Sequence, residues 1–411
     1  MIRRIGLVIA IFLLLLIPFS VRAEPDISVL DSSVKLRFPY ELIFNLEANS
    51  LADIVEARLF YQVDRMNYAQ VTSEGWPKFT PATRIETSWT WDTRTASLPP
   101  GAAVRYWWTI VNAGGSELET SPTLLRFDDT RHHWQSLTSG ELTVFWYEGD
   151  DSFARELMDI CKEGLARLTG DIGAYSENPI KIYVYASTED LQGAMIFPME
   201  WTGGIAFTEF GIITIGIPPG QLDWGRTALV HELTHLVVYQ ATFGPCGKLP
   251  TWLNEGLAMY NEGGLDPYFN LYLQKAISEG GLISVRSLCS PFSAESEKAY
   301  VSYAEAYSLV KYLLDNYGQD KMLNILTLFK QGNTYDEALI KVYGFDIDGL
   351  DEGWRASLVS SMNQPAIIVG NIWLHPSLIA VLSALATSLV LAGALALEEW
   401  SWRAQAEKLK K

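Results

Sequence analysis

The sequence predicts a multidomain protein with an N-terminal all-β sandwich, then an α+β domain, then a single C-terminal transmembrane helix. Three observations lead to this prediction. Short runs of β-branched and aromatic residues, separated by turn residues, fill residues 28 to about 130. Strand-like and helix-like segments are mixed in the part that follows. A run of twenty almost wholly apolar residues ends at Leu397. The expected parts are a signal peptide (1–23), the β-sandwich (24–130), the α+β domain (139–362), the transmembrane helix (376–397) and a cytoplasmic tail (398–411).

The N-terminus has the three regions of a secretory signal peptide. Arg3 and Arg4 precede an apolar run from Ile5 to Phe19, and a small-residue cleavage site ends at Ala23. We expect cleavage after Ala23. An uncleaved anchor is the alternative, because the apolar run approaches the roughly 17 residues that can span a bilayer.

The sandwich is predicted from short strands between turn signals at Asn49-Ser50, Pro99-Pro100-Gly101 and Gly114-Gly115. The strands are expected at Lys35–Phe38, Glu41–Glu47, Val55–Val63, Ile85–Trp91, Val104–Val111 and Leu124–Phe127. The turn Leu98-Pro99-Pro100-Gly101 before Tyr106-Trp107-Trp108 resembles fibronectin type III or immunoglobulin-like domains. Four tryptophans either form a binding face or pack in the core, and packing is the interpretation we favour: Trp89, Trp91, Trp107 and Trp108.

The α+β domain is expected after a boundary at Arg131 to Gly140, where His132 and His133 are predicted to be exposed. Its first elements are a strand (Leu142–Tyr147), a helix (Ser152–Leu168), a strand (Ile180–Tyr185) and a hairpin (Gly204–Phe207 with Ile212–Ile217). The part from Asp266 to Met362 is mostly helical.

The most informative motif is His231-Glu232-Leu233-Thr234-His235. Residues four apart share one face of a helix, so both imidazoles can reach one metal ion. The surrounding helix, Gln221 to Tyr239, is apolar nearly all round, which is typical of a buried helix. Buried imidazoles need partners, and a metal ion supplies one for both. Glu232 adjoins the first ligand and is placed to take a proton from water.

Glu255 is the predicted third ligand, since two histidines and a glutamate are a common zinc set with one open position. Pro245, Gly247 and Pro250 interrupt the chain before it, and Thr251 is expected to cap a new helix. Glu262 is the competing candidate. We prefer Glu255 because its neighbours are apolar and a ligand needs burial.

The motif and the downstream glutamate resemble the gluzincin zinc metallopeptidases, and the phrase from Leu249 to Ala258 resembles the bacterial peptidase MA-like domains in particular. The resemblance covers roughly residues 140–360. It implies a zincin-like fold, one Zn²⁺ per chain held by His231, His235 and Glu255, and Glu232 as the general base. It also implies that the strand Ile212–Ile217 forms the edge of the cleft and holds an extended peptide by strand addition.

This sequence departs from the thermolysin-like pattern at two points. Met259 stands where those enzymes have an aspartate that orients a histidine ligand, so that partner is unassigned. No suitable downstream histidine exists to stabilise the transition state. A tyrosine is the alternative donor, and Tyr303 is our choice, although Tyr303 and Tyr307 could equally be packing residues.

The C-terminal apolar run of Leu378 to Leu397 is about 30 Å long as a helix, which matches a hydrocarbon core. Lysines and Arg403 follow it, whereas no Lys or Arg lies between Arg355 and the run. The positive-inside rule therefore places the tail in the cytoplasm and the body outside the cell membrane. A buried core helix is the alternative.

Charge and cysteines exclude other classes. A net charge of −17 does not suit nucleic-acid binding. Three cysteines exclude a disulfide-dense scaffold. A disulfide between Cys246 and Cys289 that braces the loop between the two zinc helices is one alternative, and two unpaired thiols are the other. Cys161 is expected to be a buried free thiol.

The sequence thus predicts a membrane-anchored, extracytoplasmic zinc metallopeptidase that acts on a peptide or protein. No free-amine clamp is evident, which favours an endopeptidase. The rival is a cell-surface binding protein with a structural or inactive zinc domain. A structural site needs no general base and usually has four protein ligands, which argues against the rival.

Overall fold

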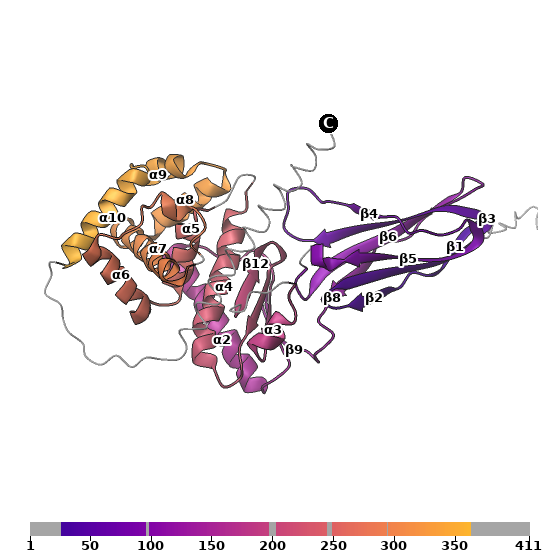
Figure 1. Ribbon diagram of the computed structural model, residues 1–411, viewed down its shortest axis with the longest axis horizontal. Coiled ribbons are helices and arrows are strands. Elements are labelled where there is room, and N and C mark those ends of the chain that lie inside the picture. The colour runs from indigo at the N-terminus through magenta and orange to yellow at the C-terminus, as the bar shows by residue number, and fades with distance from the viewer. Residues whose placement is uncertain (1–25, 96–97, 197–202, 245–248, 294, 363–411) are drawn as a thin grey trace, which may run out of the picture.

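The computed structural model describes residues 26–362, apart from 96–97, 197–202, 245–248 and 294. The described residues form a β-rich N-terminal region and a following α+β region, as predicted (Figure 1). The residues of the predicted signal peptide, transmembrane helix and cytoplasmic tail lie outside the described part of the chain. Within the described part, we find no helix that combines the length and apolar character needed to cross a bilayer.

The N-terminal region is an eight-stranded sheet built around β3 (Glu41–Asp64). Residues 41–49 of β3 pair with β5, and residues 54–64 pair with β6. The predicted turn at Asn49-Ser50 is wrong, because both residues continue the ladder with β1 and only the register with β5 shifts after Asn49. The other strands are β1 (Ile27–Asp31), β2 (Val34–Arg37), β4 (Ser73–Gly75), β5 (Ala82–Asp92), β6 (Ala102–Asn112), β7 (Glu117–Glu119) and β8 (Thr123–Phe127).

Both halves of β3 contribute to one apolar core. Phe44 from the first half and Leu59 from the second are fully buried in it, together with Trp108 of β6. The sheet therefore folds back on itself through β3, since a sheet with one apolar face gains stability by covering that face. The fibronectin type III or immunoglobulin-like identity of this region stays a prediction.

The tryptophans mostly pack, as we favoured. Trp91 and Trp108 are buried in the core. Trp89 lies over Gly75, where a Cβ atom would come within 2.6 Å of the indole ring. Trp107 is partly exposed and stacks on a phenylalanine of β3.

The second sheet is five-stranded, with the order β12-β13-β11-β10-β9. Parallel pairing joins β11 to β10 and to β13, and the two outer pairs are antiparallel. Residues of β11 are buried along nearly its whole length, as expected for a central parallel strand covered on both faces. The strands are β9 (Gln135–Ser139), β10 (Leu142–Trp146), β11 (Ile180–Tyr185), β12 (Gly204–Phe207) and β13 (Ile212–Gly216).

Two predictions about this sheet are wrong. The cleft edge was assigned to Ile212–Ile217, but β13 pairs with β12 on one side and β11 on the other. Among the described residues, the outer strand on this side of the sheet is therefore β12. The expected linker at Arg131 to Gly140 also contains β9, which pairs with β10.

The helices pack around α4 (Leu222–Thr242), which contacts α2, α5, α8 and the strands β12 and β13 (Figure 1). Its apolar residues point in all directions, and it is buried nearly all round, which confirms the prediction. The other helices are α2 (Asp151–Arg167), α3 (Thr188–Gln192), α5 (Thr251–Asn261), α6 (Pro267–Glu279), α7 (Ser296–Tyr317), α8 (Gln319–Lys330), α9 (Tyr335–Tyr343) and α10 (Ile347–Met362).

The seam between the two regions centres on Asp129, a buried carboxylate. It accepts hydrogen bonds from the Arg131 guanidinium, at 2.7 and 2.9 Å, and from the Tyr185 hydroxyl of β11 at 3.0 Å. His133 is exposed as expected, but His132 is not, because its ring stacks on Tyr147 at 3.9 Å. The buried charge of Asp129 is tolerated because it is paired with Arg131 and hydrogen-bonded to Tyr185.

The cysteines are only partly tested. Cys161 is fully buried, as predicted, and burial raises the pKa of its thiol to about 12. Cys289 is a free, half-buried thiol, which does not support its pairing with Cys246, a residue outside the described part of the chain.

Candidate metal centre

Three predicted ligands meet where α4 passes α5. His231 Nε2 lies 3.0 Å from His235 Nε2, and Glu255 Oε2 lies 3.6 Å and 3.5 Å from these two atoms. All three side chains are buried. The helical spacing of four places both imidazoles on one face of α4, and Glu255 lies one turn into α5 and faces them.

These atoms fit a zinc ion. On a tetrahedral Zn²⁺ with bonds of about 2.1 Å, neighbouring ligand atoms lie about 3.4 Å apart, which is close to the three distances here. Glu255 Oε2 is buried without a hydrogen-bond partner among the described residues. Such an orphaned buried oxygen is costly unless a cation binds it. Two neutral histidines and one carboxylate are a donor set that zinc accepts, and they leave one coordination position open.

The charges around the ligands also suit a cation. Burial opposes ionisation of Glu255, but the positive field of His235 and His231 lowers its pKa to about 2. Burial likewise opposes a charge on His231, yet its carboxylate neighbours raise its pKa to about 10. Among the described residues, the ion pairs of Glu255 and Glu262 involve histidines alone. A bound divalent cation would replace the protons of these histidines, leave both rings neutral, and supply the positive charge that the buried carboxylates need.

Glu262 is the orienting partner that the sequence did not assign. Its Oε1 lies 2.6 Å from Nδ1 of His231, on the side of the ring opposite the metal ligands. When Nδ1–H donates a hydrogen bond to Glu262, Nε2 carries no proton, and its lone pair can bind a metal. Glu255 and Glu262 are seven residues apart, two helical turns, so both face α4. Met259 is buried in the apolar core and has no such role.

Glu232 lies beside the ligands without joining them. It is 3 % exposed, and burial raises the pKa of its carboxyl. The backbone N–H of Ala206, on the open edge strand β12, donates a hydrogen bond to it. Gly204 lies close by, because a Cβ atom there would be 3.4 Å from Glu232 Cγ. The edge strand thus fixes the predicted base.

α5 begins differently from the prediction. Thr251 is the first helical residue, Pro250 precedes it as the N-cap, and no side chain caps the helix. The Thr251 hydroxyl donates instead to the carbonyl of Cys289 at 3.2 Å. Gly256 lets α5 approach α7 closely, since a Cβ atom there would lie 2.3 Å from the carbonyl oxygen of Ala306.

Tyr303, on α7, lies in the field of this cluster. Burial, with the charges of Glu255 and Glu232, raises the pKa of its phenol well above the usual range. Tyr307 is elsewhere, half-buried and tilted against Tyr260 with 6.1 Å between ring centroids. Of the two candidate tyrosines, the helix therefore brings Tyr303 towards the ligands.

Comparison with protein families agrees with this geometry. Residues 160–360 match the model of the Peptidase MA superfamily. These residues form a Peptidase MA superfamily domain. The match contains the three candidate ligands and both Glu232 and Glu262. No curated protein matches the chain.

Similar solved structures include two aminopeptidases. Aminopeptidase A from Legionella pneumophila, in complex with aspartic acid, is 11% identical, and the match covers 80% of this chain and 49% of that one, with a TM-score of 0.35. An aminopeptidase N family protein from Idiomarina loihiensis is 9% identical, with 80% and 75% covered and a TM-score of 0.35. OgpA from Akkermansia muciniphila is 12% identical, with a TM-score of 0.20, and the match covers 25% of this chain and 28% of OgpA.

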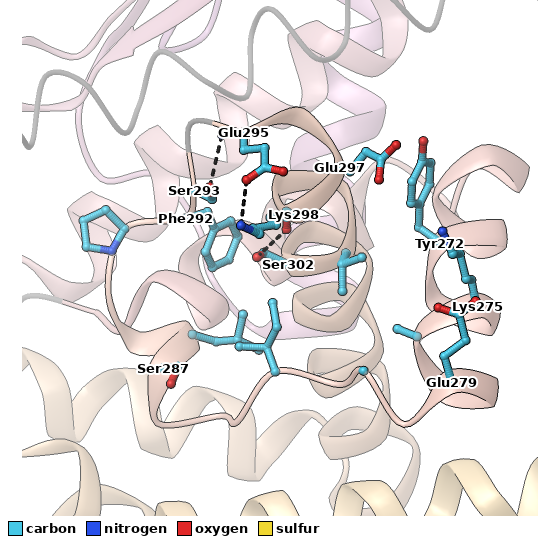
Figure 2. Close-up of a pocket in the computed structure, with 16 residues that line it drawn as sticks. Tyr272, Lys275, Glu279, Ser287, Phe292, Ser293, Glu295, Glu297, Lys298 and Ser302 are labelled. Atoms are coloured by element: carbon cyan, nitrogen blue, oxygen red, sulfur yellow. Dashed lines mark hydrogen bonds and ion pairs between the residues drawn. The ribbon is translucent and has the colours of Figure 1, made fainter.

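A cavity of about 490 Å³ in the Peptidase MA domain lies apart from the metal centre. Figure 2 shows it between Tyr272, Lys275 and Glu279 of α6 and Lys298 of α7, which forms an ion pair with Glu295. None of the candidate ligands lines this cavity. It is therefore not the site where the predicted chemistry takes place.

Proposed function

We propose that this protein is a membrane-anchored, extracytoplasmic zinc metallopeptidase that hydrolyses peptide bonds within chains. One observation carries the proposal. Three buried ligand atoms converge within 3.6 Å of one another, and a fourth buried group, Glu232, lies beside them without being a ligand. A structural zinc site has no use for such a base.

His231, His235 and Glu255 would hold the ion. When bound, zinc would act as a Lewis acid, which polarises the substrate carbonyl and lowers the pKa of water to about 7. Glu232 accepts a proton from the attacking water and returns it to the leaving nitrogen. The raised pKa of Glu232, caused first by burial, suits a group that must both take up and release a proton.

The open edge of β12 would hold the peptide. The β12–β13 register pairs Ile205 with Thr214 and Phe207 with Ile212, and Gly203 accepts a hydrogen bond from Gly216. Backbone groups alternate in direction along a strand, so those of Ala206 point away from β13. An extended substrate lying there is presented to Glu232, because Ala206 already donates to that carboxylate.

Tyr303 would assist by donating a hydrogen bond to the oxyanion of the transition state. Its position in the field of Glu232 and Glu255 supports this role. A single donor of this kind contributes about 3 kcal/mol to transition-state stabilisation.

The membrane topology rests on the two ends of the sequence, since a signal peptide and a C-terminal apolar run followed by basic residues predict the same orientation. Protease treatment of intact cells tests it. The domains should be degraded while a C-terminal tag stays protected. Protection of the domains would refute this topology.

The catalytic proposal is tested with the purified full-length protein in detergent and an unfolded protein substrate. Wild type should contain one zinc per chain and cleave the substrate. Glu232→Gln should keep the zinc and lose about 10²- to 10⁴-fold in kcat. Glu255→Gln should lose zinc as well.

Two results would count against this proposal. Unchanged zinc in Glu255→Gln would place the third ligand elsewhere. If wild type and Glu232→Gln bind zinc alike and neither cleaves any member of a peptide library, the protein is a cell-surface binding protein with an inactive zinc domain.

A further inference from the structure

Helix α5 ends at the residue that orients His231. Glu262 is the C-cap of this helix, and Gly263 and Gly264 follow it with φ angles of 106° and 148°. Glycine adopts such angles without strain, so the chain leaves the helix immediately after Glu262. The last turn of a helix frays readily, because its final carbonyl groups have no partners within the helix. The 2.6 Å contact between Glu262 and His231 therefore depends on what else holds this end of α5.

Asn261, the last residue of α5, is attached to two other helices. It directly precedes Glu262 and is only 2% exposed. Its side-chain Nδ2 lies 2.8 Å from the Thr234 hydroxyl of α4 and 3.4 Å from the Gly164 carbonyl oxygen of α2. Its own carbonyl oxygen accepts a hydrogen bond from Nε of Arg167, at the end of α2, at 3.0 Å. One buried residue thus joins the end of α5 to both α4 and α2.

The chemistry of these partners requires a donor at position 261. The Thr234 hydroxyl donates its one proton to the carbonyl of Val230 at 2.7 Å, so towards Asn261 it can only accept. The carbonyl of Gly164 can also only accept. An amide nitrogen carries two protons and satisfies both acceptors, whereas an apolar side chain satisfies neither. The type of residue at this position is therefore set by its partners.

Thr234 belongs to the turn of α4 that carries the candidate ligands. It is fully buried, directly before His235 and three residues after His231. Its hydrogen bond to Asn261 therefore limits how far the end of α5 can slide along this turn. On the other side, α2 is close-packed, because a Cβ atom on Gly164 would lie 3.1 Å from a valine side chain of α4. The three helices thus meet tightly beside the metal centre.

We propose that Asn261 is a positioning residue of the metal centre, which holds the end of α5 so that Glu262 meets Nδ1 of His231. Among the described residues, its hydrogen bonds reach none of the candidate ligands, so it acts through Glu262. Loss of its amide would leave the buried carbonyl of Gly164 and the hydroxyl of Thr234 short of a donor, and the helix end would shift to recover one. This inference deepens the proposed function and rests on it.

The test measures zinc affinity of the full-length protein in detergent, by competition with a chromophoric chelator, after circular dichroism has shown that each variant is folded. Asn261→Ala should bind zinc about tenfold more weakly than wild type. Thr234→Val keeps the volume but removes the hydroxyl, and it should weaken zinc binding similarly. Thr234→Ser keeps the hydroxyl and should restore binding to within about twofold of wild type.

A double-mutant cycle separates positioning from a general loosening of the helices. In the Glu262→Ala background, Asn261→Ala should change zinc affinity by less than about twofold, because the group that it positions is already gone. The matched control is Gln240→Ala, which removes another buried amide of α4. Gln240 Oε1 accepts hydrogen bonds from the Ser176 hydroxyl at 3.0 Å and the Asn178 N–H at 3.3 Å. This control should lower stability in urea melts and leave zinc affinity unchanged.

Three results would count against these proposals. If folded Asn261→Ala and Thr234→Val bind zinc as wild type does, Asn261 is only a structural link and the inference is refuted. The same conclusion follows if the loss of affinity is equally large with and without Glu262. Thr234→Val is the milder change, so the cycle is run with it if Asn261→Ala does not fold. If wild type itself binds no zinc, the metal centre and the proposed function fail.

Discussion

Replacement of Glu262 by glutamine removes the charge that orients the first histidine ligand. The carboxylate is 2.6 Å from His231 Nδ1, and its side chain is only 8% exposed, so this is a short, charge-assisted hydrogen bond shielded from water. Glutamine keeps the shape and one acceptor oxygen but has no charge. Alanine removes the acceptor entirely.

Loss of a partner of this kind lowers metal affinity by about 10- to 100-fold, which corresponds to roughly 1.4–2.7 kcal/mol. Because the glutamine oxygen can still accept a hydrogen bond from Nδ1–H, we expect about tenfold weaker zinc binding for Glu262→Gln and about 100-fold for Glu262→Ala. Competition with a chromophoric chelator measures the affinity. The control is Glu163→Gln, since Glu163 is 59% exposed and its ion pair with Arg226 lies on the surface.

Two outcomes would refute this reasoning. If both Glu262 variants fold normally and bind zinc within twofold of wild type, Glu262 does not orient His231. If Glu262→Ala instead loses zinc as completely as Glu255→Gln, Glu262 is itself a ligand, and the geometry has been assigned incorrectly.

Two further predictions concern stability. Glu305 is buried in α7, and burial raises the pKa of its carboxyl from 4.5 to about 8, so its ionisation opposes folding increasingly as the pH rises from about 4.5 to 8. Glu305→Gln should therefore leave the free energy of unfolding unchanged near pH 4.5 and raise it by up to a few kcal/mol at pH 8. Urea melts at the two pH values measure this difference. An equal effect of the substitution at both pH values would contradict the prediction. Gly256→Ala should destabilise the protein by about 1–3 kcal/mol, because a Cβ atom would collide with the Ala306 carbonyl. Gly170→Ala is the control and should be nearly neutral in the same melts, because a Cβ atom there would meet nothing within 4 Å.

The core of the metal centre was predictable because it depends on short-range helical periodicity. The spacing of His231 and His235 fixes their common face, and the apolar surroundings of α4 indicate its burial. Glu255 was predicted from a break in the chain, a new helix and an apolar neighbourhood. The structure brings its oxygen to the two imidazoles, as expected.

What the sequence could not predict depends on contacts between distant segments. Glu262 was considered only as a rival ligand, because its role depends on how α5 crosses α4 and on which nitrogen of His231 it meets. The edge strand was misassigned because strand order is set by pairing between distant segments. The alternation of apolar and polar residues along one strand does not encode that pairing. The break expected at Asn49-Ser50 is absent for the same reason, because β1 continues the ladder across it.

The contacts of Asp129 limit how far the chain can be truncated from its N-terminal side. A truncation that starts at residue 139 would remove this carboxylate together with Arg126, whose guanidinium donates to the Tyr183 hydroxyl at 3.2 Å. The outer ends of two tyrosines of β11 would then lose their partners, and the face of the sheet that carries them would meet solvent. A shortened variant for crystallisation or assay should therefore retain the β-rich region, because its removal exposes one side of the central strand of the α+β domain.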